Sequence, residues 1–230
     1  MQNAVVSHED WLAARRDLLQ KEKELTHLRD SVASERLALP WERIEKDYVF
    51  DTLDGPRSLA GLFEGRSQLV VQHFMFAPGW KEGCPSCSFM ADHADGMNLH
   101  LANHDVTMIA VSRAPLADIE RYRKRMGWTF GWVSSFGSDF NYDFQVSFTP
   151  EEVASGHIDY NFGGWNMTGE EWPGVSAFIK NEAGEVFRTY STYGRGVEVM
   201  MGTYAMLDLT PKGRNEARGM DWVRRHDRYE

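Results

Sequence analysis

The chain has 230 residues, of which 42% are hydrophobic and 26% charged, a composition that excludes a disordered or fibrous protein. This length allows one large domain or two small ones, each with a buried core. The formal net charge of −9 argues against nucleic acid and anionic membrane surfaces as partners, because both repel an acidic protein.

Nothing in the sequence predicts a membrane protein or an exported one. No apolar run reaches the roughly 18 residues that a membrane-spanning helix needs. The first residues, MQNAVVSHEDWLAARRD, lack the basic stretch and apolar block of a secretory signal. We therefore expect a soluble, cytoplasmic protein.

Residues 7–36 are predicted to form a long amphipathic helix. Ser7 followed by Asp10 is a plausible capping box. Apolar residues then recur at helical spacing among many charges, at Trp11, Leu12, Leu18, Leu19, Leu25, Leu28 and Val32. We assign residues 1–38 to a helical arm and residues 39–230 to the main domain. Two interpretations stay open here: the arm packs on a second copy in a homo-oligomer, or it docks on its own domain.

The main domain alternates strands and helices in its first half. We expect a strand over 47–51, a short helix over 58–63, a buried strand over 68–76, a helix over 84–104, a buried strand over 105–112 and a charged helix over 114–126. Residues 141–148 fit either a strand or a short helix. A hairpin follows over 175–180 and 185–191, then a helix over 197–209. Alternation predicts parallel pairing through crossover helices, and the hairpin adds antiparallel strands. The expected fold is α/β, a mixed sheet with helices on both faces.

The two cysteines of the chain lie in one motif, Cys84-Pro85-Ser86-Cys87. A cytosolic pair at this spacing is more typical of catalysis or metal binding than of a structural disulfide. Pro85 suits the first position of a helix, which makes Cys84 the cap and places Cys87 one turn later on the same face. The positive end of the helix favours a thiolate and so lowers the pKa of Cys84. Cys84 would then attack a disulfide, and Cys87 would resolve the mixed disulfide.

Two other functions fit the same cysteines. Cys84 and Cys87, followed by His100 and His104, match the ligand spacing of a two-Cys two-His zinc finger. Against that metal site, Pro85 favours a helix where a finger needs a hairpin. The third hypothesis is a non-enzymatic binding or scaffold protein in which the cysteines are incidental. The sequence contains no dinucleotide fingerprint and no phosphate loop, so we predict no cofactor.

Several stretches resemble a known family. LVVQHFMF, the Cys-Pro-Ser-Cys helix start and DVTMIAVS look like the thioredoxin-like superfamily. From about Leu39 to Glu230 the chain resembles a bacterial thioredoxin-like family known as domain of unknown function 899. FMFAPGWKEGCPSCSFMAD, VSRAPLADIERYRKRMGW, SSFGSDFNYDFQVSF and STYGRG carry that likeness. The resemblance implies a thioredoxin-like mixed sheet flanked by helices, but no established reaction.

The resemblance also implies substrate-binding residues. Thioredoxin-like proteins place a cis-proline beside the cysteines, and Pro173 is the matching residue. Trp80 and Trp172 flank the two candidate substrate loops, where aromatic walls suit peptide or small-molecule docking. A disulfide-containing protein or a small thiol compound is the expected substrate. Because the chain lacks the Pro-to-Thr-to-Cys pattern of peroxiredoxins, thiol-disulfide exchange is favoured over peroxidase action.

The chain departs from thioredoxins in two places. Trp80 lies four residues ahead of Cys84 instead of directly before it, and the buried acid beneath the cysteines has no match, its place falling near His73. A buried neutral His73 could act as a base for Cys87, although a structural histidine within a strand is the commoner case. Arg195 could stabilise an anionic substrate or a thiolate, and a solvated or helix-capping arginine is an equal alternative.

Overall fold

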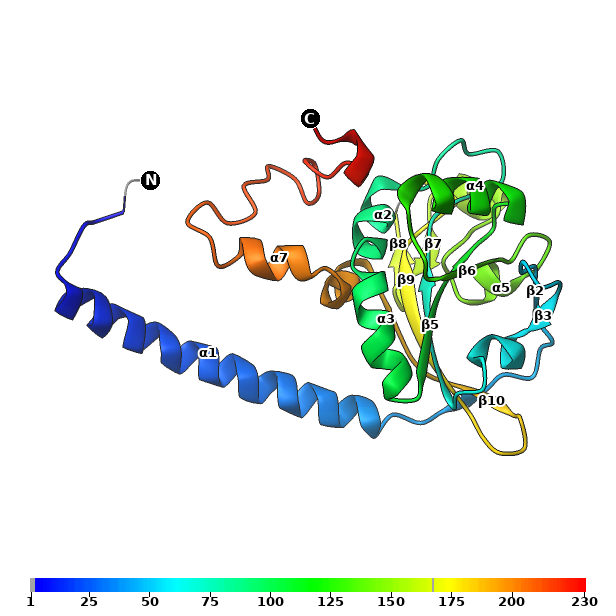
Figure 1. Cartoon of the computed structure of the whole chain (residues 1–230), viewed down its shortest axis with the longest axis horizontal. Coiled ribbons are helices and arrows are strands. Elements are labelled where there is room, and N and C mark those ends of the chain that lie inside the picture. Colours follow the sequence, from blue (N-terminus) through cyan, green and yellow to red (C-terminus); the bar gives the residue numbers. More distant parts are fainter. Residues whose placement is uncertain (1–2, 167) are drawn as a thin grey trace. The chain divides into compact units, whose positions relative to one another are not determined.

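The computed structural model describes residues 3–166 and 168–230, which divide into two compact units, Met1–Pro40 and Trp41–Glu230. The first unit is helix α1 (His8–Leu37), drawn in Figure 1 as one uninterrupted helix. Its N-cap is Ser7, whose hydroxyl accepts a hydrogen bond from the N–H of Asp10 at 3.1 Å. The predicted helix over 7–36 is therefore confirmed to within one residue at each end. No helix in the described parts of the chain is long and apolar enough to cross a membrane.

The second unit is built on a six-stranded sheet (Figure 1). The strand order is β1 (Glu42–Arg43), β10 (Val186–Tyr193), β9 (Gly174–Lys180), β4 (Gln68–His73), β5 (Val106–Ser112) and β6 (Gly131–Ser134). The pairs β4/β5 and β5/β6 are parallel, and the other neighbours are antiparallel. The predicted mixed sheet is confirmed, because the crossover helices and the hairpin both lie where the sequence pattern put them.

Two hydrophobic cores lie on opposite faces of the sheet. One packs beneath α2 (Pro85–Ala91), α3 (Ala94–Asn103) and α4 (Leu116–Met126). The other packs beneath the 3-10 helix η1 (Leu59–Phe63) and the short helix α5 (Phe140–Asp143). Because successive side chains of a strand point to opposite faces, β4 supplies Val71 to the second core and Val70 to the first. Helices thus cover both faces, and the α/β arrangement expected from the sequence, a mixed sheet flanked by helices, is confirmed.

Two predicted helices are each broken in two. The helix expected over 84–104 is interrupted between α2 and α3, where His93 anchors the junction. Its Nδ1–H donates to the carbonyl of Phe89 at 2.8 Å, and its Nε2 accepts from the N–H of Thr203 at 3.1 Å. The helix expected over 197–209 is a 3-10 helix, η2 (Gly194–Met200), followed by α7 (Gly202–Leu207), with Met201 in a non-helical conformation between them.

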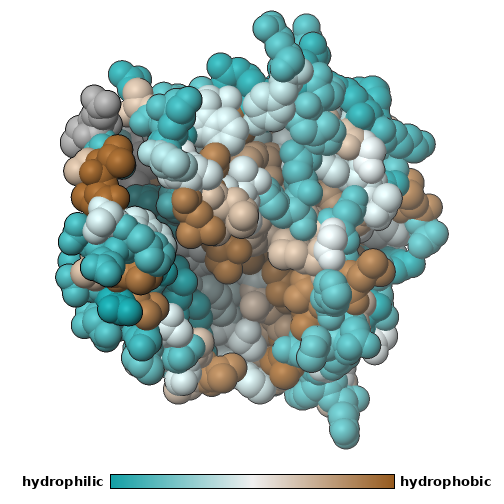
Figure 2. Space-filling model, turned by 60° about the vertical axis from the view of Figure 1, so that its left-hand side comes forward, coloured by the Kyte–Doolittle hydropathy of each residue, from teal (hydrophilic) through white to brown (hydrophobic). Residues whose placement is uncertain are grey.

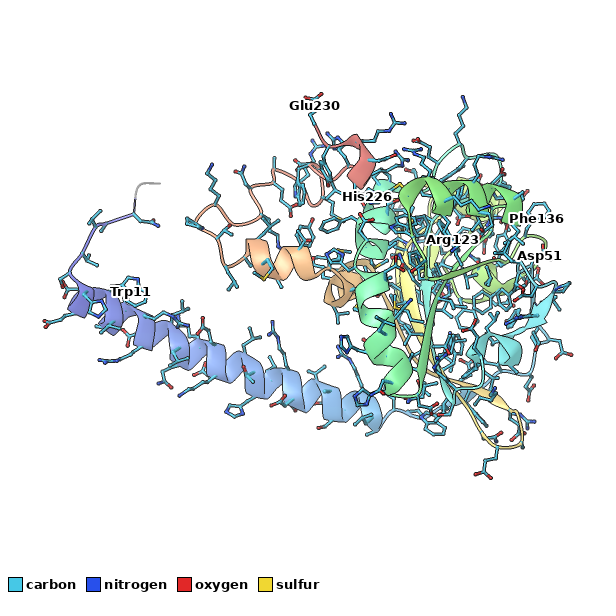
Figure 3. The ribbon with its side chains drawn as sticks, viewed as in Figure 1. Trp11, Asp51, Arg123, Phe136, His226 and Glu230 are labelled. Atoms are coloured by element: carbon cyan, nitrogen blue, oxygen red, sulfur yellow. The ribbon has the colours of Figure 1, made fainter. Side chains whose placement is uncertain are left out.

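Short elements escaped prediction. The strand expected over 47–51 is only β2 (Val49–Phe50), which pairs with β3 (Arg57–Ser58) outside the main sheet. Asp51, labelled in Figure 3, joins this ribbon to β6 through a hydrogen bond from its N–H to the carbonyl of Ser134 at 2.9 Å. The uncertain stretch 141–148 begins inside α5 and continues as a turn. Elements with no predicted counterpart are β1, β3, β6, α6 (Pro150–Ala154), β7 (Ile158–Tyr160), β8 (Gly163–Trp165) and the 3-10 helix η3 (His226–Arg228).

Gly83, which directly precedes the first cysteine, offers a test of the first core. A Cβ there would lie 2.5 Å from the ring of Phe74 and 2.9 Å from that of Tyr122. Since both rings are packed in this core, Gly83→Ala should lower the free energy of unfolding by about 1–3 kcal/mol in urea titrations. Gly96→Ala is the matched control, since a Cβ on that helical residue meets nothing within 4 Å. Equal stabilities of the two variants would contradict the packing argument.

Candidate active site

The dithiol is held against the end of β4 by the backbone of Met75. The N–H of Cys84 donates to the Met75 carbonyl at 3.0 Å, and the N–H of Met75 donates to Cys87 Sγ at 3.5 Å. Cys84 is the N-cap of α2 and Pro85 occupies its first turn, which confirms the predicted helix start. Both cysteines are free thiols.

The two thiols ionise differently. Cys84 is half-buried, and hydrogen bonds from the Cys87 thiol and from the backbone N–H groups of Cys87 and Ser86 lower its pKa to about 6. Cys87 is 1% exposed, and its hydrogen bond to Cys84, together with burial, raises its pKa well above the ordinary thiol value. These opposite shifts favour a thiolate at Cys84 and a protonated thiol at Cys87 near neutral pH.

A buried ion pair lies near Cys87. Glu171 is 4% exposed and accepts a hydrogen bond from Arg113 Nε at 2.7 Å and one from the Ser147 hydroxyl at 3.1 Å. The negative charge of Glu171 is a further cause of the raised pKa of Cys87. Sequence reasoning missed this acid, because it sits in an irregular stretch before Trp172, and only the fold brings it toward the cysteines.

A cavity of about 960 Å³ opens beside the dithiol, and both cysteines line it. Tyr160 also lines the cavity and ties two of its wall segments together. The Tyr160 hydroxyl donates to the carbonyl of Pro173 at 2.7 Å and accepts from the N–H of Gly194 at 2.8 Å. Figure 2, in which the α7 side of the molecule is turned forward, shows apolar side chains gathered among polar ones.

Residues after β10 form much of the cavity wall. Arg214 pairs with Asp208 at 2.9 Å and with Glu198 at 3.3 Å. Glu216 accepts three hydrogen bonds, from the Tyr204 hydroxyl, the Trp222 indole and the N–H of Met220. The polar C-terminal segment, in which the sequence predicted no site, is therefore a structured part of the cavity.

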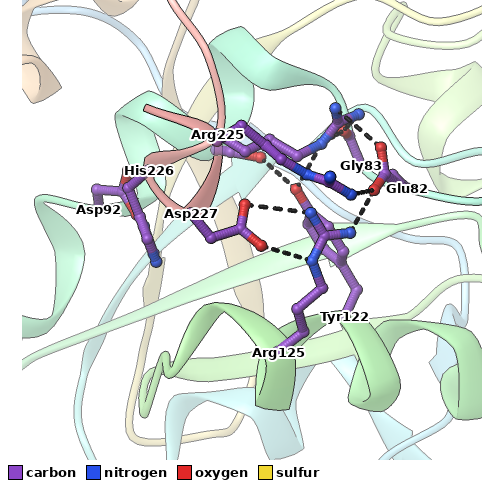
Figure 4. Close-up of polar contacts among 10 residues, drawn as sticks. Glu82, Gly83, Asp92, Tyr122, Arg125, Arg225, His226 and Asp227 are labelled. Carbon is purple, nitrogen blue, oxygen red and sulfur yellow. Dashed lines mark hydrogen bonds and ion pairs between the residues drawn. The ribbon is translucent and has the colours of Figure 1, made fainter. Parts of the chain in front are cut away.

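The last residues also fasten the loop that leads into Cys84, as Figure 4 shows. Arg225 donates to the carbonyl of Gly83 at 2.6 Å and to the Tyr122 hydroxyl at 3.0 Å, and it pairs with Glu82 at 2.9 Å. His226, labelled in Figures 3 and 4, contacts Asp92 at the end of α2 at 2.6 Å. The position of the reactive loop thus depends on the C-terminal segment.

The structure brings together most of the predicted site residues. Trp172 and Pro173 line the cavity with Cys84 and Cys87. Arg195 lines it too, with its guanidinium exposed and paired with Glu198 at 2.9 Å. Trp80 is 40% exposed on the loop before Cys84 and is outside the residues that line the cavity. Peptide bonds throughout the described residues are trans, so the expected cis bond before Pro173 is absent.

His73 lies on the face of the sheet opposite the dithiol. Its ring packs against Phe140 and Phe144 in the second core, and its Nε2 is 2.8 Å from the hydroxyl of Ser176. Burial lowers the pKa of His73 to about 3, so the ring is neutral. The hypothesis that it serves Cys87 is wrong, because the ring lies in the second core. The alternative, a histidine satisfied within its strand, holds only in part, since Nδ1 is buried without a hydrogen-bond partner among the described residues. Its neighbour Gln72 faces the dithiol instead, donating to the carbonyl of Cys87 at 3.1 Å.

The zinc-finger alternative is contradicted by the placement of its histidines. His100 and His104 are exposed at the C-terminal end of α3, whereas the cysteines lie at the start of α2. Across residues 3–166 and 168–230, no three His, Cys, Asp or Glu side chains come together in a way that could hold a metal ion. The lengths of α2 and α3 lie between the two halves of the motif.

Comparisons with solved structures find distant neighbours. Peroxidoxin BcpB of Mycobacterium tuberculosis is 11% identical, with 72% of this chain and 97% of that chain covered and a TM-score of 0.48. The bacterioferritin comigratory protein of Xanthomonas campestris, studied for alkyl peroxide reduction, is 12% identical, with coverage of 73% and 98% and a TM-score of 0.46. A candidate protein disulfide isomerase of Bacteroides thetaiotaomicron is 16% identical, with coverage of 77% and 94% and a TM-score of 0.38.

Comparison of the sequence with family models, unlike the distant structural neighbours, shows the family of the chain. No curated protein matches the chain. One family model, described as a bacterial protein of unknown function (DUF899), matches residues 1–229, so the likeness includes the N-terminal helix as well as the region from Leu39 onward. The chain therefore belongs to this family, domain of unknown function 899.

Proposed function

We propose that this protein is a thiol-disulfide oxidoreductase in which Cys84 is the nucleophile and Cys87 the resolving thiol. The observation that carries the proposal is the unequal burial of two free thiols that both line one cavity. Cys84 is half-buried with a lowered pKa, whereas Cys87 is buried with a raised one. This division of roles is what stepwise exchange requires.

The reaction has two balanced steps. The Cys84 thiolate attacks one sulfur of a substrate disulfide, which breaks the S–S bond, forms a Cys84 mixed disulfide and releases the first substrate sulfur as a thiolate. Cys87 then loses its proton and attacks Cys84 Sγ, which forms the Cys84–Cys87 disulfide and releases the second substrate thiol. An external dithiol must reduce the protein disulfide for a further turnover. The reaction needs no cofactor, and we place it in the cytoplasm, where such reductants are maintained.

The first test is the pH dependence of Cys84 alkylation. Because its folded-state pKa is lowered to about 6, the iodoacetamide rate should rise with pH through a midpoint near that value. The thiolate should then dominate at pH 7, whereas an unperturbed thiol of pKa about 8.5 would be mostly protonated there. The measurement is peptide mass after timed quenching, with the urea-unfolded chain as control. A folded midpoint matching the unfolded one would refute the activated thiolate.

Single-cysteine variants test the two roles. Cys84→Ser should abolish reduction of a model disulfide, because it removes the attacking sulfur. Cys87→Ser should accumulate a mixed disulfide on Cys84, visible as a mass increase equal to half the substrate. The double variant controls for non-specific thiol chemistry. Normal turnover by either single variant would contradict the assignment, and unchanged cellular behaviour of Cys84→Ser would favour the scaffold hypothesis.

The acid near Cys87 generates a separate prediction. Glu171→Gln removes a negative charge that raises the pKa of Cys87, so that pKa should fall. The readout is the alkylation midpoint of Cys87 in a Cys84→Ser background, where Cys87 is the remaining thiol. Glu170→Gln, which changes the neighbouring exposed carboxylate, is the matched control. An unchanged or higher midpoint in the Glu171→Gln protein would rule out the electrostatic link.

A further inference from the structure

The cavity beside the dithiol has the dimensions of a small-molecule site. Its volume of about 960 Å³ lies at the upper end of the roughly 300–1,000 Å³ typical of ligand pockets. Cys84 lines it and is half-buried, so a disulfide seated in the cavity lies within reach of the nucleophile. What the walls are made of therefore decides which disulfides are accepted.

The walls are rich in thioether and aromatic side chains. Four of the eleven methionines of the chain line the cavity, Met75, Met90, Met201 and Met220. Methionine is flexible and polarizable, and surfaces rich in it adapt to apolar ligands of varied shape. Tyr160, Trp172 and Tyr204 add aromatic surface. Such a lining stabilises alkyl groups by removing them from water.

The charges of the cavity disfavour anions. Two arginines and three carboxylates line it, a net charge of −1 before the Cys84 thiolate adds another negative charge. Both arginines are already engaged: Arg195 with Glu198 at 2.9 Å, and Arg214 with Asp208 at 2.9 Å and Glu198 at 3.3 Å. A carboxylate on a substrate would compete for cations that Glu198 and Asp208 already hold, and it would be repelled by the thiolate.

The geometry points to a binding site for uncharged, apolar small-molecule disulfides, with anionic disulfides such as glutathione disulfide discriminated against. The inference rests on the proposed function and specifies its substrate class. The alkyl groups lie against the methionine and aromatic walls while Cys84 attacks the S–S bond. One substrate sulfur leaves as a thiolate and the other is released when Cys87 closes the protein disulfide.

The experiment measures single turnovers of the reduced full-length protein. Dimethyl, diethyl, dipropyl and dibutyl disulfide are compared with glutathione disulfide, and formation of the Cys84–Cys87 bond is followed by quenching with N-ethylmaleimide and mass measurement. Each rate is divided by the rate at which dithiothreitol reduces the same disulfide. This division corrects for differences in intrinsic reactivity among the disulfides. The normalised rate should rise about twofold to fourfold for each added methylene on the bound chain. Glutathione disulfide should react at least about tenfold more slowly than dipropyl disulfide.

Three variants distinguish the contribution of the apolar wall to substrate preference from that of the charged residues. Met201→Gln makes the buried wall polar and should flatten the chain-length dependence, whereas Met206→Gln, on an exposed residue of α7 outside the cavity, should retain it. Glu198→Gln frees Arg195 and leaves Arg214 paired with Asp208 alone, which makes the net charge of the lining less negative and should raise the rate with glutathione disulfide several-fold. Rates independent of chain length, or glutathione disulfide as the fastest substrate, would overturn the inference and leave the proposed function standing. Failure of every disulfide to form the Cys84–Cys87 bond would overturn both.

Discussion

The structure depends on a pair of hydrogen bonds made by one backbone unit. Met75, just beyond the end of β4, accepts from the N–H of Cys84 and donates to the sulfur of Cys87. These bonds join the start of α2 to the sheet, so that Cys87 is turned inward and Cys84 stays half-buried at the cavity. The Met75 N–H bond on its own lowers the pKa of Cys87, so the difference between the two thiols follows from the hydrogen bond between them and from the burial that this attachment imposes on Cys87.

The two halves of the main domain supply different parts of the site. The segment from β4 through α4 contributes the dithiol and the core beneath it. The segment from Tyr160 onward contributes most of the apolar wall, the paired charges and the acid near Cys87, while Met75 and Met90 of the first segment complete the wall. A parallel βαβ unit therefore presents Cys84, and the antiparallel hairpin with its following helices contributes to the cavity beside it. Under the proposed function, the attacking thiol and most of the substrate-binding wall come from regions that are distant in sequence.

The features that could be predicted from sequence are those that depend on neighbouring residues. The α1 cap at Ser7, the buried strands and the helix start at Pro85 each follow from local spacing and backbone preference. The mixed sheet follows from the order of these elements. Cys84 and Cys87 could be predicted as site residues for the same reason, because one four-residue motif contains both.

The features that escaped prediction depend on tertiary contacts. The break between α2 and α3 is anchored by Thr203, more than one hundred residues away, through His93. Whether His73 or Gln72 faces the dithiol is decided by the strand's register, and a shift of one residue exchanges the two faces. Glu171 has no local signal at all, because its significance arises from its ion pair with Arg113. Residues of this kind become visible only when the chain is folded.

The hydrogen bond from Arg225 to the carbonyl of Gly83 has a consequence for synthesis on the ribosome. A chain emerges from its N-terminus, so the sheet strands and both cysteines are available before residue 225 has been made. During that interval the loop before Cys84 lacks its bonds to Arg225, and the cavity lacks the wall that Glu216 organises. Until then the nascent chain carries an incomplete site, and the residues around Cys84 come together only after Arg225 has been made.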